Sequence, residues 1–150
     1  MRALDAQGAQ RSWKGFEMRA AKLEQVWNSP TTGERIAEAY TADGVRIEIA
    51  RPGARLEGRA AIAAHVQAYL DAVPDCVLDI RGSFETNGVT TLEWTYRGTH
   101  TGDIPGFPAQ GETIDLPGVS VLVMEGELVK EERVYWDAAT LFGLMEPAAG

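Results

Sequence analysis

The stretch NGVTTLEWTYRGTH, residues 87–100, is the most informative part of this chain for its fold. Asn-Gly is a dipeptide typical of the two-residue turn of a β-hairpin, and the residues after it alternate in character. Leu92, Trp94 and Tyr96 fall on one face of an extended strand, whereas charged and hydroxyl-bearing residues fall on the other. The stretch therefore predicts a hairpin strand that turns its large aromatic side chains toward the interior.

The segments on both sides of this strand have the same character. CVLDIRGSFE at 76–85 precedes the turn, and ETIDLPGVSVLVM at 112–124 follows a loop rich in Gly and Pro. A second turn, Glu125-Gly126, leads into ELVKEERVYW at 127–136. Strand-like runs separated by turn residues predict consecutive antiparallel strands.

The N-terminal half contains three predicted helices. Helical spacing of apolar residues predicts a helix over 12–28 and a short one from about Thr32 to Tyr40. The clearest helix covers 58–73 and is ended by Pro74. Most of the helical pattern therefore precedes the run of strands.

One strand is predicted among these helices. VRIEIA, residues 45–50, alternates between apolar and charged residues. Its apolar residues form one face, and Arg46 and Glu48 form the other. This pattern predicts a strand that is buried on its apolar face.

The order of these elements predicts an α+β fold. Helices followed by antiparallel strands are typical of a curved sheet with helices over one face. We expect one domain over residues 12–145, a flexible arm at 1–11 and a short tail at 146–150.

Composition narrows the function classes. The chain has 150 residues, 45% of them apolar, and a formal net charge of −8. Nucleic-acid binding needs clustered Lys and Arg, and an anionic membrane surface disfavours an acidic protein, so we expect neither partner. Cys76 is the only cysteine, which excludes an internal disulfide, and the first residues contain no apolar signal core. We therefore expect a cytoplasmic protein.

Several short segments resemble the SnoaL-like polyketide cyclases, a group of the NTF2-like superfamily that also contains ketosteroid isomerase. The most specific segments are Gly98-Thr99-His100-Thr101-Gly102 and Tyr135-Trp136-Asp137. Weaker matches lie at 40–45, 57–62 and 74–75, and the resemblance spans roughly residues 16 to 145. It implies a cone in which a curved sheet wraps around three helices. Because this fold hosts many chemistries, the resemblance indicates a superfamily better than a reaction.

The resemblance also implies where chemistry takes place. In such proteins an apolar ligand lies inside the cone, and an Asp near the end of the chain serves as acid/base, in some relatives with a His. Asp137 and His100 occupy the matching positions. Relatives of this fold often dimerise through the exposed sheet face, and VSVLVM at 119–124 is apolar on both faces. We therefore expect a homodimer.

Common catalytic and cofactor motifs are missing, since the chain has no GxSxG, HExxH or CxxC. We therefore expect no metal and no cofactor, and proton transfer by carboxylate, imidazole and phenol. Asp137 would move the proton, while His100 and Tyr96 hydrogen-bond the oxygen where charge develops. The apolar surroundings of Asp137 are expected to raise its pKa. The expected substrate contacts are Trp27, Tyr40, His65, Trp94, Phe107 and Tyr135.

Each of these assignments has a structural alternative. Asp137 could cap a terminal helix over AATLFGLM, and His100 could anchor the loop that follows it. His65 could be a satisfied core histidine, and Glu131-Glu132 is most simply a solvated edge. Both faces of the strand at 127–136 are mixed, so alternation does not decide which one is inside.

The sequence thus predicts a cofactor-independent cyclase or isomerase. Its substrate would be a mostly apolar, polyketide- or terpenoid-like molecule of natural-product biosynthesis. The alternatives on the same fold are a ketosteroid-isomerase-like enzyme, a dehydratase and an epoxide hydrolase. A further alternative is a ligand-binding module without chemistry.

Overall fold

The computed structural model describes residues 24–28, 30–50, 54–104 and 108–145, with side chains as far as Leu141. Residues 24–27 are helical, which agrees with the end of the first predicted helix. The rest of that helix, the predicted arm and tail, and Phe107 lie outside the described residues.

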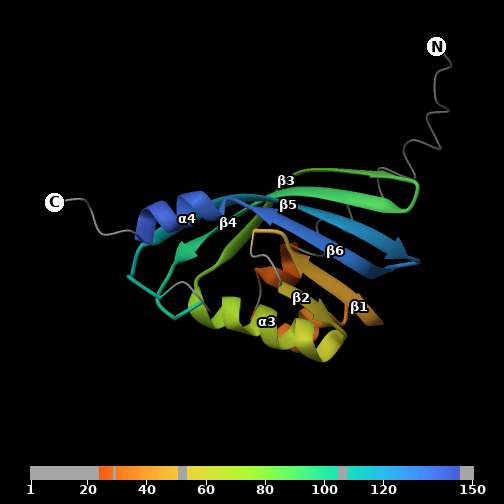
Figure 1. Cartoon of the computed structure of the whole chain (residues 1–150), viewed down its shortest axis with the longest axis horizontal. Coiled ribbons are helices and arrows are strands. Elements are labelled where there is room, and N and C mark those ends of the chain that lie inside the picture. The colour runs from red at the N-terminus through yellow and green to blue at the C-terminus, as the bar shows by residue number, and fades with distance from the viewer. Residues whose placement is uncertain (1–23, 29, 51–53, 105–107, 146–150) are drawn as a thin grey trace, which may run out of the picture.

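Six strands form one curved, unclosed sheet (Figure 1). The order across it is β2-β1-β6-β5-β4-β3. Neighbouring strands run antiparallel except β1 and β6, which run parallel. The strands are β1 (Tyr40–Glu48), β2 (Ala54–Glu57), β3 (Val77–Thr86), β4 (Val89–Thr99), β5 (Thr113–Glu125) and β6 (Leu128–Trp136). This arrangement confirms the predicted α+β class.

The hairpin between β3 and β4 forms as its sequence predicts. Asn87 and Gly88 both have positive φ, 50° and 74°, which is the conformation of the favoured two-residue hairpin turn. The turn fixes the register that pairs Thr86 with Val89. Alternation along β4 is then as predicted, with Leu92 and Tyr96 buried and Glu93 exposed.

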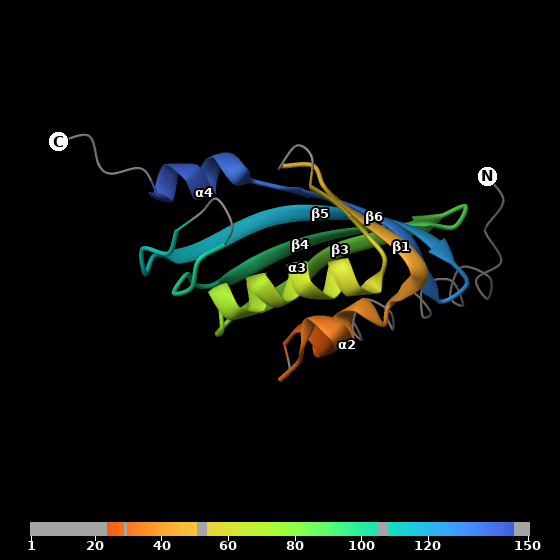
Figure 2. The ribbon, with the colours of Figure 1, turned by 60° about the horizontal axis from the view of Figure 1, so that its bottom comes forward.

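Helices cover the concave face of the sheet. Figure 2 shows α2 (Gly33–Ala37) and α3 (Arg59–Ala72) on that side, and α4 (Ala138–Met145) beyond the end of β6. The side chains of Ile62 and Val66 on α3 are fully buried. The predicted helix from Thr32 to Tyr40 is shorter than expected, because the chain becomes extended at Tyr40, the first residue of β1.

β1 has the alternation that the sequence predicts, but its inner face is the opposite one. Arg46 and Glu48 are only 8% and 2% exposed, whereas Val45 and Ile47 are half-buried and Ile49 is 41% exposed. The prediction that the apolar face packs on the core was wrong. Burial of the charges is possible because each meets a hydrogen-bonding partner from another element.

The inner face of β6, which the sequence left open, carries Glu132, Val134 and Trp136. Tyr135 lies on the outer face and is 43% exposed. Glu132 is 8% exposed, so its interpretation as a solvated residue was wrong. Two strands, β1 and β6, thus bring charged side chains to the interior.

Candidate active site

The concave side of the sheet encloses a cavity. The centre of a water-sized sphere can occupy a volume of about 120 Å³ inside it. Its wall is mostly apolar and is built from strands β1 and β3–β6, both covering helices, the helical residues 24–27 and α4. Its polar and aromatic lining residues include Trp27, Tyr40, Arg46, Glu48, Tyr69, Trp94, Tyr96, Ser120, Glu132 and Trp136.

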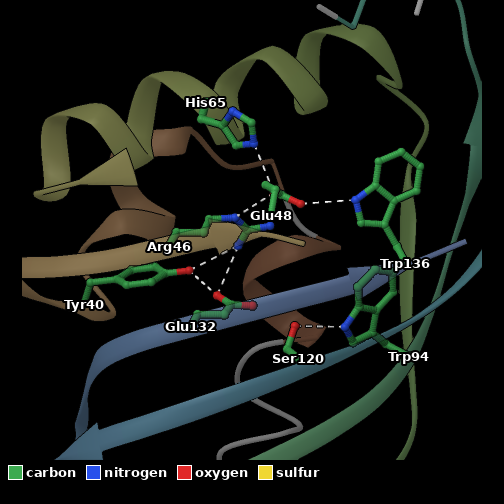
Figure 3. Close-up of polar contacts among 8 residues, drawn as sticks. All are labelled: Tyr40, Arg46, Glu48, His65, Trp94, Ser120, Glu132 and Trp136. Carbon is green, nitrogen blue, oxygen red and sulfur yellow. Dashed lines mark hydrogen bonds and ion pairs between the residues drawn. The ribbon is translucent and has the colours of Figure 1, made fainter. Parts of the chain in front are cut away.

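A hydrogen-bonded cluster of Tyr40, Arg46 and Glu132 forms one part of the wall (Figure 3). The Tyr40 hydroxyl donates to Oε1 of Glu132. Arg46 Nη1 donates to the same oxygen over 3.1 Å and to the Tyr40 oxygen over 3.2 Å. Parallel pairing of β1 with β6 sets Arg46 opposite Glu132, which is why these two side chains meet on one face.

Glu48 extends this cluster toward α3 and the end of β6. Its Oε1 accepts from Arg46 Nε at 3.1 Å and lies 3.0 Å from His65 Nε2. Its Oε2 accepts from Trp136 Nε1 at 3.2 Å. Glu48 is therefore held from three elements, β1, α3 and β6 (Figure 3).

These contacts fix the protonation states. Burial alone would raise the pKa of Glu48, but Arg46 and His65 outweigh it and lower this pKa to about 2. Burial, reinforced by Glu132, raises the pKa of the Tyr40 hydroxyl. Burial opposes the charge of Arg46, yet Glu132, Tyr40 and Glu48 raise its pKa overall. Tyr40 is thus a neutral donor, and Arg46 and Glu48 are charged.

Two polar atoms of the cluster have no hydrogen-bond partner among the described residues. They are Oε2 of Glu132 and Nη2 of Arg46. Both side chains are 10% exposed and line the cavity. In Figure 3 the second oxygen of Glu132 points to the side where Ser120 and Trp94 lie. A carboxylate oxygen and a guanidinium N–H are therefore available to a ligand.

Trp94 forms an aromatic part of the wall. Its Nε1 donates to Ser120 Oγ at 3.0 Å. The indole lies directly over Gly118 on β5, where an added Cβ would come within 2.3 Å of Trp94 Cη2. The glycine and the hydrogen bond together determine the position of the ring.

Tyr96 lines the cavity as predicted, but its hydroxyl already has a partner. It donates to the Tyr69 carbonyl at 3.3 Å. Burial, followed by Cys76, raises the pKa of Tyr96, so the phenol stays neutral. Its ring packs edge-to-face against Trp27 at 6.4 Å between centroids.

Asp137 does not lie where the sequence predicted. It is absent from the described cavity wall and follows β6 at the start of α4. Its Oδ1 accepts from the backbone N–H of Thr140 at 2.9 Å, and its Oδ2 accepts from the Thr140 hydroxyl. These bonds lower its pKa, opposite to the expected direction. Asp137 is therefore a helix cap, the structural alternative named above.

His100 is also outside the described cavity wall. Its side chain is fully buried, and its Nδ1 lies 2.5 Å from Glu112 Oε1. Its backbone N–H donates to the Glu112 carbonyl, and its carbonyl accepts from Gly111. The predicted placement in the cavity was wrong, because this histidine closes the base of the loop at 101–111.

The predicted substrate contacts divide into two groups. Trp27, Tyr40 and Trp94 line the cavity. His65 binds Glu48 from outside the wall and packs against Tyr69, and Tyr135 is on the outer face of the sheet. The prediction that Tyr135 contacts a ligand in the cavity was wrong, and Phe107 lies outside the described residues.

Arg46, Glu48, Glu132, Ser120 and Trp136 were missed as site residues. Alternation separates the faces of a strand but does not say which face is inside. The mixed character of both faces of β6 was the one available signal, since a strand with charges on each face must bury some of them. The partner that makes burial of Glu132 tolerable lies far away in the sequence, on β1.

Within the part of the chain that the structure describes, no group of three or more His, Cys, Asp or Glu side chains is arranged to hold a metal ion. Among the same residues, no helix is both long and apolar enough to cross a membrane.

Solved structures share this fold. A candidate SnoaL-like polyketide cyclase from Jannaschia sp. CCS1 is 16% identical, with a TM-score of 0.76 over 87% of this chain and 92% of that one. A ketosteroid-isomerase-like protein from Catenulispora acidiphila, in complex with trimethylamine, is 19% identical, with a TM-score of 0.69 over 85% and 91%. AclR, a candidate hydroxylase from Streptomyces galilaeus, is 18% identical, with a TM-score of 0.72 over 89% and 87%.

At these identities the likeness is one of fold. No curated protein matches this chain. The sequence model of one family, the SnoaL-like polyketide cyclases, matches residues 17–143. That match covers most of the chain and agrees with the curved sheet, the covering helices and the enclosed cavity described above. The protein belongs to the SnoaL-like polyketide cyclase family.

Proposed function

We propose that the protein is a cofactor-independent cyclase or isomerase in which Glu132 moves the proton. The supporting observation is the Glu132 carboxylate, which lies nine-tenths buried in an apolar wall with one oxygen held and the other available. The substrate would be a mostly apolar, polyketide- or terpenoid-like carbonyl compound of natural-product biosynthesis. We place the enzyme in the cytoplasm and expect a homodimer.

The chemistry follows from the two available atoms. Oε2 of Glu132 removes a proton from a C–H next to a substrate carbonyl, and the C–H electron pair forms an enolate. Nη2 of Arg46 donates to the oxygen as its negative charge develops. In a cyclisation the enolate carbon attacks a second carbonyl, and the resulting alkoxide takes the proton from Glu132. In an isomerisation the substrate is a β,γ-unsaturated carbonyl compound, so the enolate is conjugated with the C=C bond. Glu132 then returns the proton to the far carbon of that bond, and the double bond moves next to the carbonyl.

The cluster around Glu132 supports this role. Tyr40 and Arg46 both donate hydrogen bonds to Oε1 of Glu132, so rotation of the carboxylate is restricted. The orientation of Oε2 is therefore fixed as well. Trp94 and Tyr96 provide fixed aromatic surfaces on which an apolar chain can fold into a reactive geometry. Holding reactants in such a geometry is itself a large part of catalysis of ring closure.

The test uses 2-tetralone, a bicyclic ketone with acidic C–H groups, in D₂O. Exchange of its α-protons is followed by NMR with the wild type and with Glu132→Gln. Loss of a general base typically costs about a hundred- to ten-thousand-fold in rate, so we expect Glu132→Gln to lose at least about a hundredfold. Glu131→Gln, which changes the neighbouring carboxylate on the outer face, is the matched control and should stay within about twofold. Tetralone that binds without accelerated exchange would instead indicate a binding module.

A further inference from the structure

The cavity wall carries an unbalanced negative charge. Among the described residues, its charged members are Arg46, Glu48 and Glu132, which gives this part of the wall a formal charge of −1. Each of these side chains is about nine-tenths buried or more. An uncompensated charge in a low-dielectric interior is costly, so a ligand that supplies the missing positive charge is favoured.

Arg46 cannot balance both carboxylates. Its Nε binds Glu48, and its Nη1 binds Glu132 and Tyr40. Nε2 of His65 lies 3.0 Å from Oε1 of Glu48 and approaches it from outside the wall, on the α3 side. Glu132 has no such second cationic partner among the described residues, and its Oε2 is without a partner there.

Aromatic side chains are concentrated around this charge. The structure describes eight aromatic side chains, and six of these eight line the cavity. They are Trp27, Tyr40, Tyr69, Trp94, Tyr96 and Trp136. The faces of aromatic rings attract cations, most strongly when the cation is desolvated, and Trp is the most favourable ring.

These features disfavour the other charge classes. A carboxylate or phosphate ligand would meet a wall whose described residues are net negative, and Arg46 already binds two carboxylates. A neutral ligand would leave the charge unbalanced. A cation with an apolar body would balance the negative charge of the carboxylates, and its apolar part would pack against the aromatic side chains.

We propose that the cavity selects a ligand that carries a protonated amino group on an apolar body. The ammonium lies in the field of Glu132 and Glu48 and against aromatic ring faces, while the body extends along Trp94. This inference rests on the proposed function, which places the substrate in this cavity, and adds that the substrate is a cation.

The experiment compares three probes of one shape at about pH 7 by isothermal titration calorimetry. They are 2-(2-naphthyl)ethylamine, 2-(2-naphthyl)ethanol and 2-naphthylacetate. We expect the amine to bind at least about tenfold more tightly than the alcohol, a factor that corresponds to about 1.4 kcal/mol, and the acid to bind most weakly.

Variants test the cause of this preference. Either Glu132→Gln or Glu48→Gln brings the formal charge of the wall to zero, so each should reduce the preference for the amine to less than about threefold. Two independent variants keep the test decisive if one of them fails to fold. Glu93→Gln removes a carboxylate from the outer face of β4, beside Trp94 in sequence, and should leave the preference unchanged.

An alcohol that binds as tightly as the amine would overturn the inference and leave the proposed function standing. The same holds if the amine preference survives in both Gln variants. If none of the three probes binds, the cavity does not accept an apolar ring system of this size. That result would contradict the proposed function as well.

Discussion

The Tyr40 hydroxyl donates its hydrogen bond to Glu132, 92 positions later in the chain, and so joins the first residue of β1 to the inner face of β6. Arg46 donates to the same carboxylate oxygen, Oε1 of Glu132. The bond from Tyr40 connects the two parallel strands at the cavity wall, so it bears both on stability and on the orientation of Glu132.

Tyr40→Phe removes this donor and leaves the ring in place. A hydrogen bond to a charged group contributes about 1.5–3 kcal/mol, so we expect the free energy of unfolding in urea to fall by about that amount. Tyr135→Phe, on the outer face at 43% exposure, is the control and should change it by less than about 0.5 kcal/mol. Equal effects of the two substitutions would contradict a structural role for the Tyr40 hydroxyl.

Glu48 predicts a loss of stability in acid. Its folded-state pKa of about 2 lies below the ordinary value of 4.5. Its ionisation therefore stabilises the fold at every pH above 4.5, and this stabilisation is lost as the pH falls toward about 2. The difference corresponds to about 3 kcal/mol. Urea unfolding at a series of pH values should show this slope in the wild type and a flatter one in Glu48→Gln.

The order of elements in the sheet was predictable because it depends on local signals. The Asn87-Gly88 turn and the alternation through Trp94 and Tyr96 determined one hairpin and its inner face. The inner face of β1 was not predictable in this way. Its pattern is equally regular on both faces, and the choice depends on Glu132, which a single strand's sequence does not reveal.

The candidate site was predicted only at some of its aromatic residues. Trp27, Tyr40, Trp94 and Tyr96 were expected in the cavity and line it. Of the two residues given chemistry, Asp137 accepts from the backbone N–H of Thr140, and the imidazole of His100 contacts the Glu112 carboxylate. The positions of these residues in the matching motifs could not reveal their structural roles. The same residue types serve as helix caps, as loop anchors and as catalytic groups.

Asp137 provides a test that separates capping from catalysis. Asn caps helices about as well as Asp, whereas Ala does not, so Asp137→Ala should lower the melting temperature and Asp137→Asn should lower it much less. Both variants should keep α-proton exchange close to the wild-type rate. A large loss of exchange in a stable Asp137→Asn protein would restore the catalytic assignment.

The outer face of the sheet predicts a homodimer. Val119, Val121 and Val123 of β5 are only half-buried, beside the exposed Tyr135 of β6. Apolar residues on an open sheet face gain stability when a second copy covers them. Light scattering at micromolar concentration should give twice the chain mass, and Val121→Glu, which faces Arg133 across the strand pair, should give a folded monomer. A wild-type monomer would refute the prediction.

Gly118 determines where the indole of Trp94 can lie, so its substitution should alter the cavity as well as the fold. A methyl group at Gly118 would come within 2.3 Å of Trp94 Cη2, and the ring would have to leave its hydrogen bond with Ser120. Overpacking of this kind costs about 1–3 kcal/mol. We expect Gly118→Ala to lower stability by that amount and to weaken binding of a naphthyl probe.

Gly82→Ala is the matched control for this effect. Gly82 also lies in a strand, but the nearest atom to an added Cβ is Glu93 Oε2 at 3.7 Å, an ordinary contact. Ala is also favoured over Gly in a strand interior, so this variant should be neutral or slightly stabilising. Melting curves and probe titrations of both variants measure the two effects separately. If Gly118→Ala melts and binds like Gly82→Ala, the position of Trp94 does not depend on Gly118, and another contact must hold the ring.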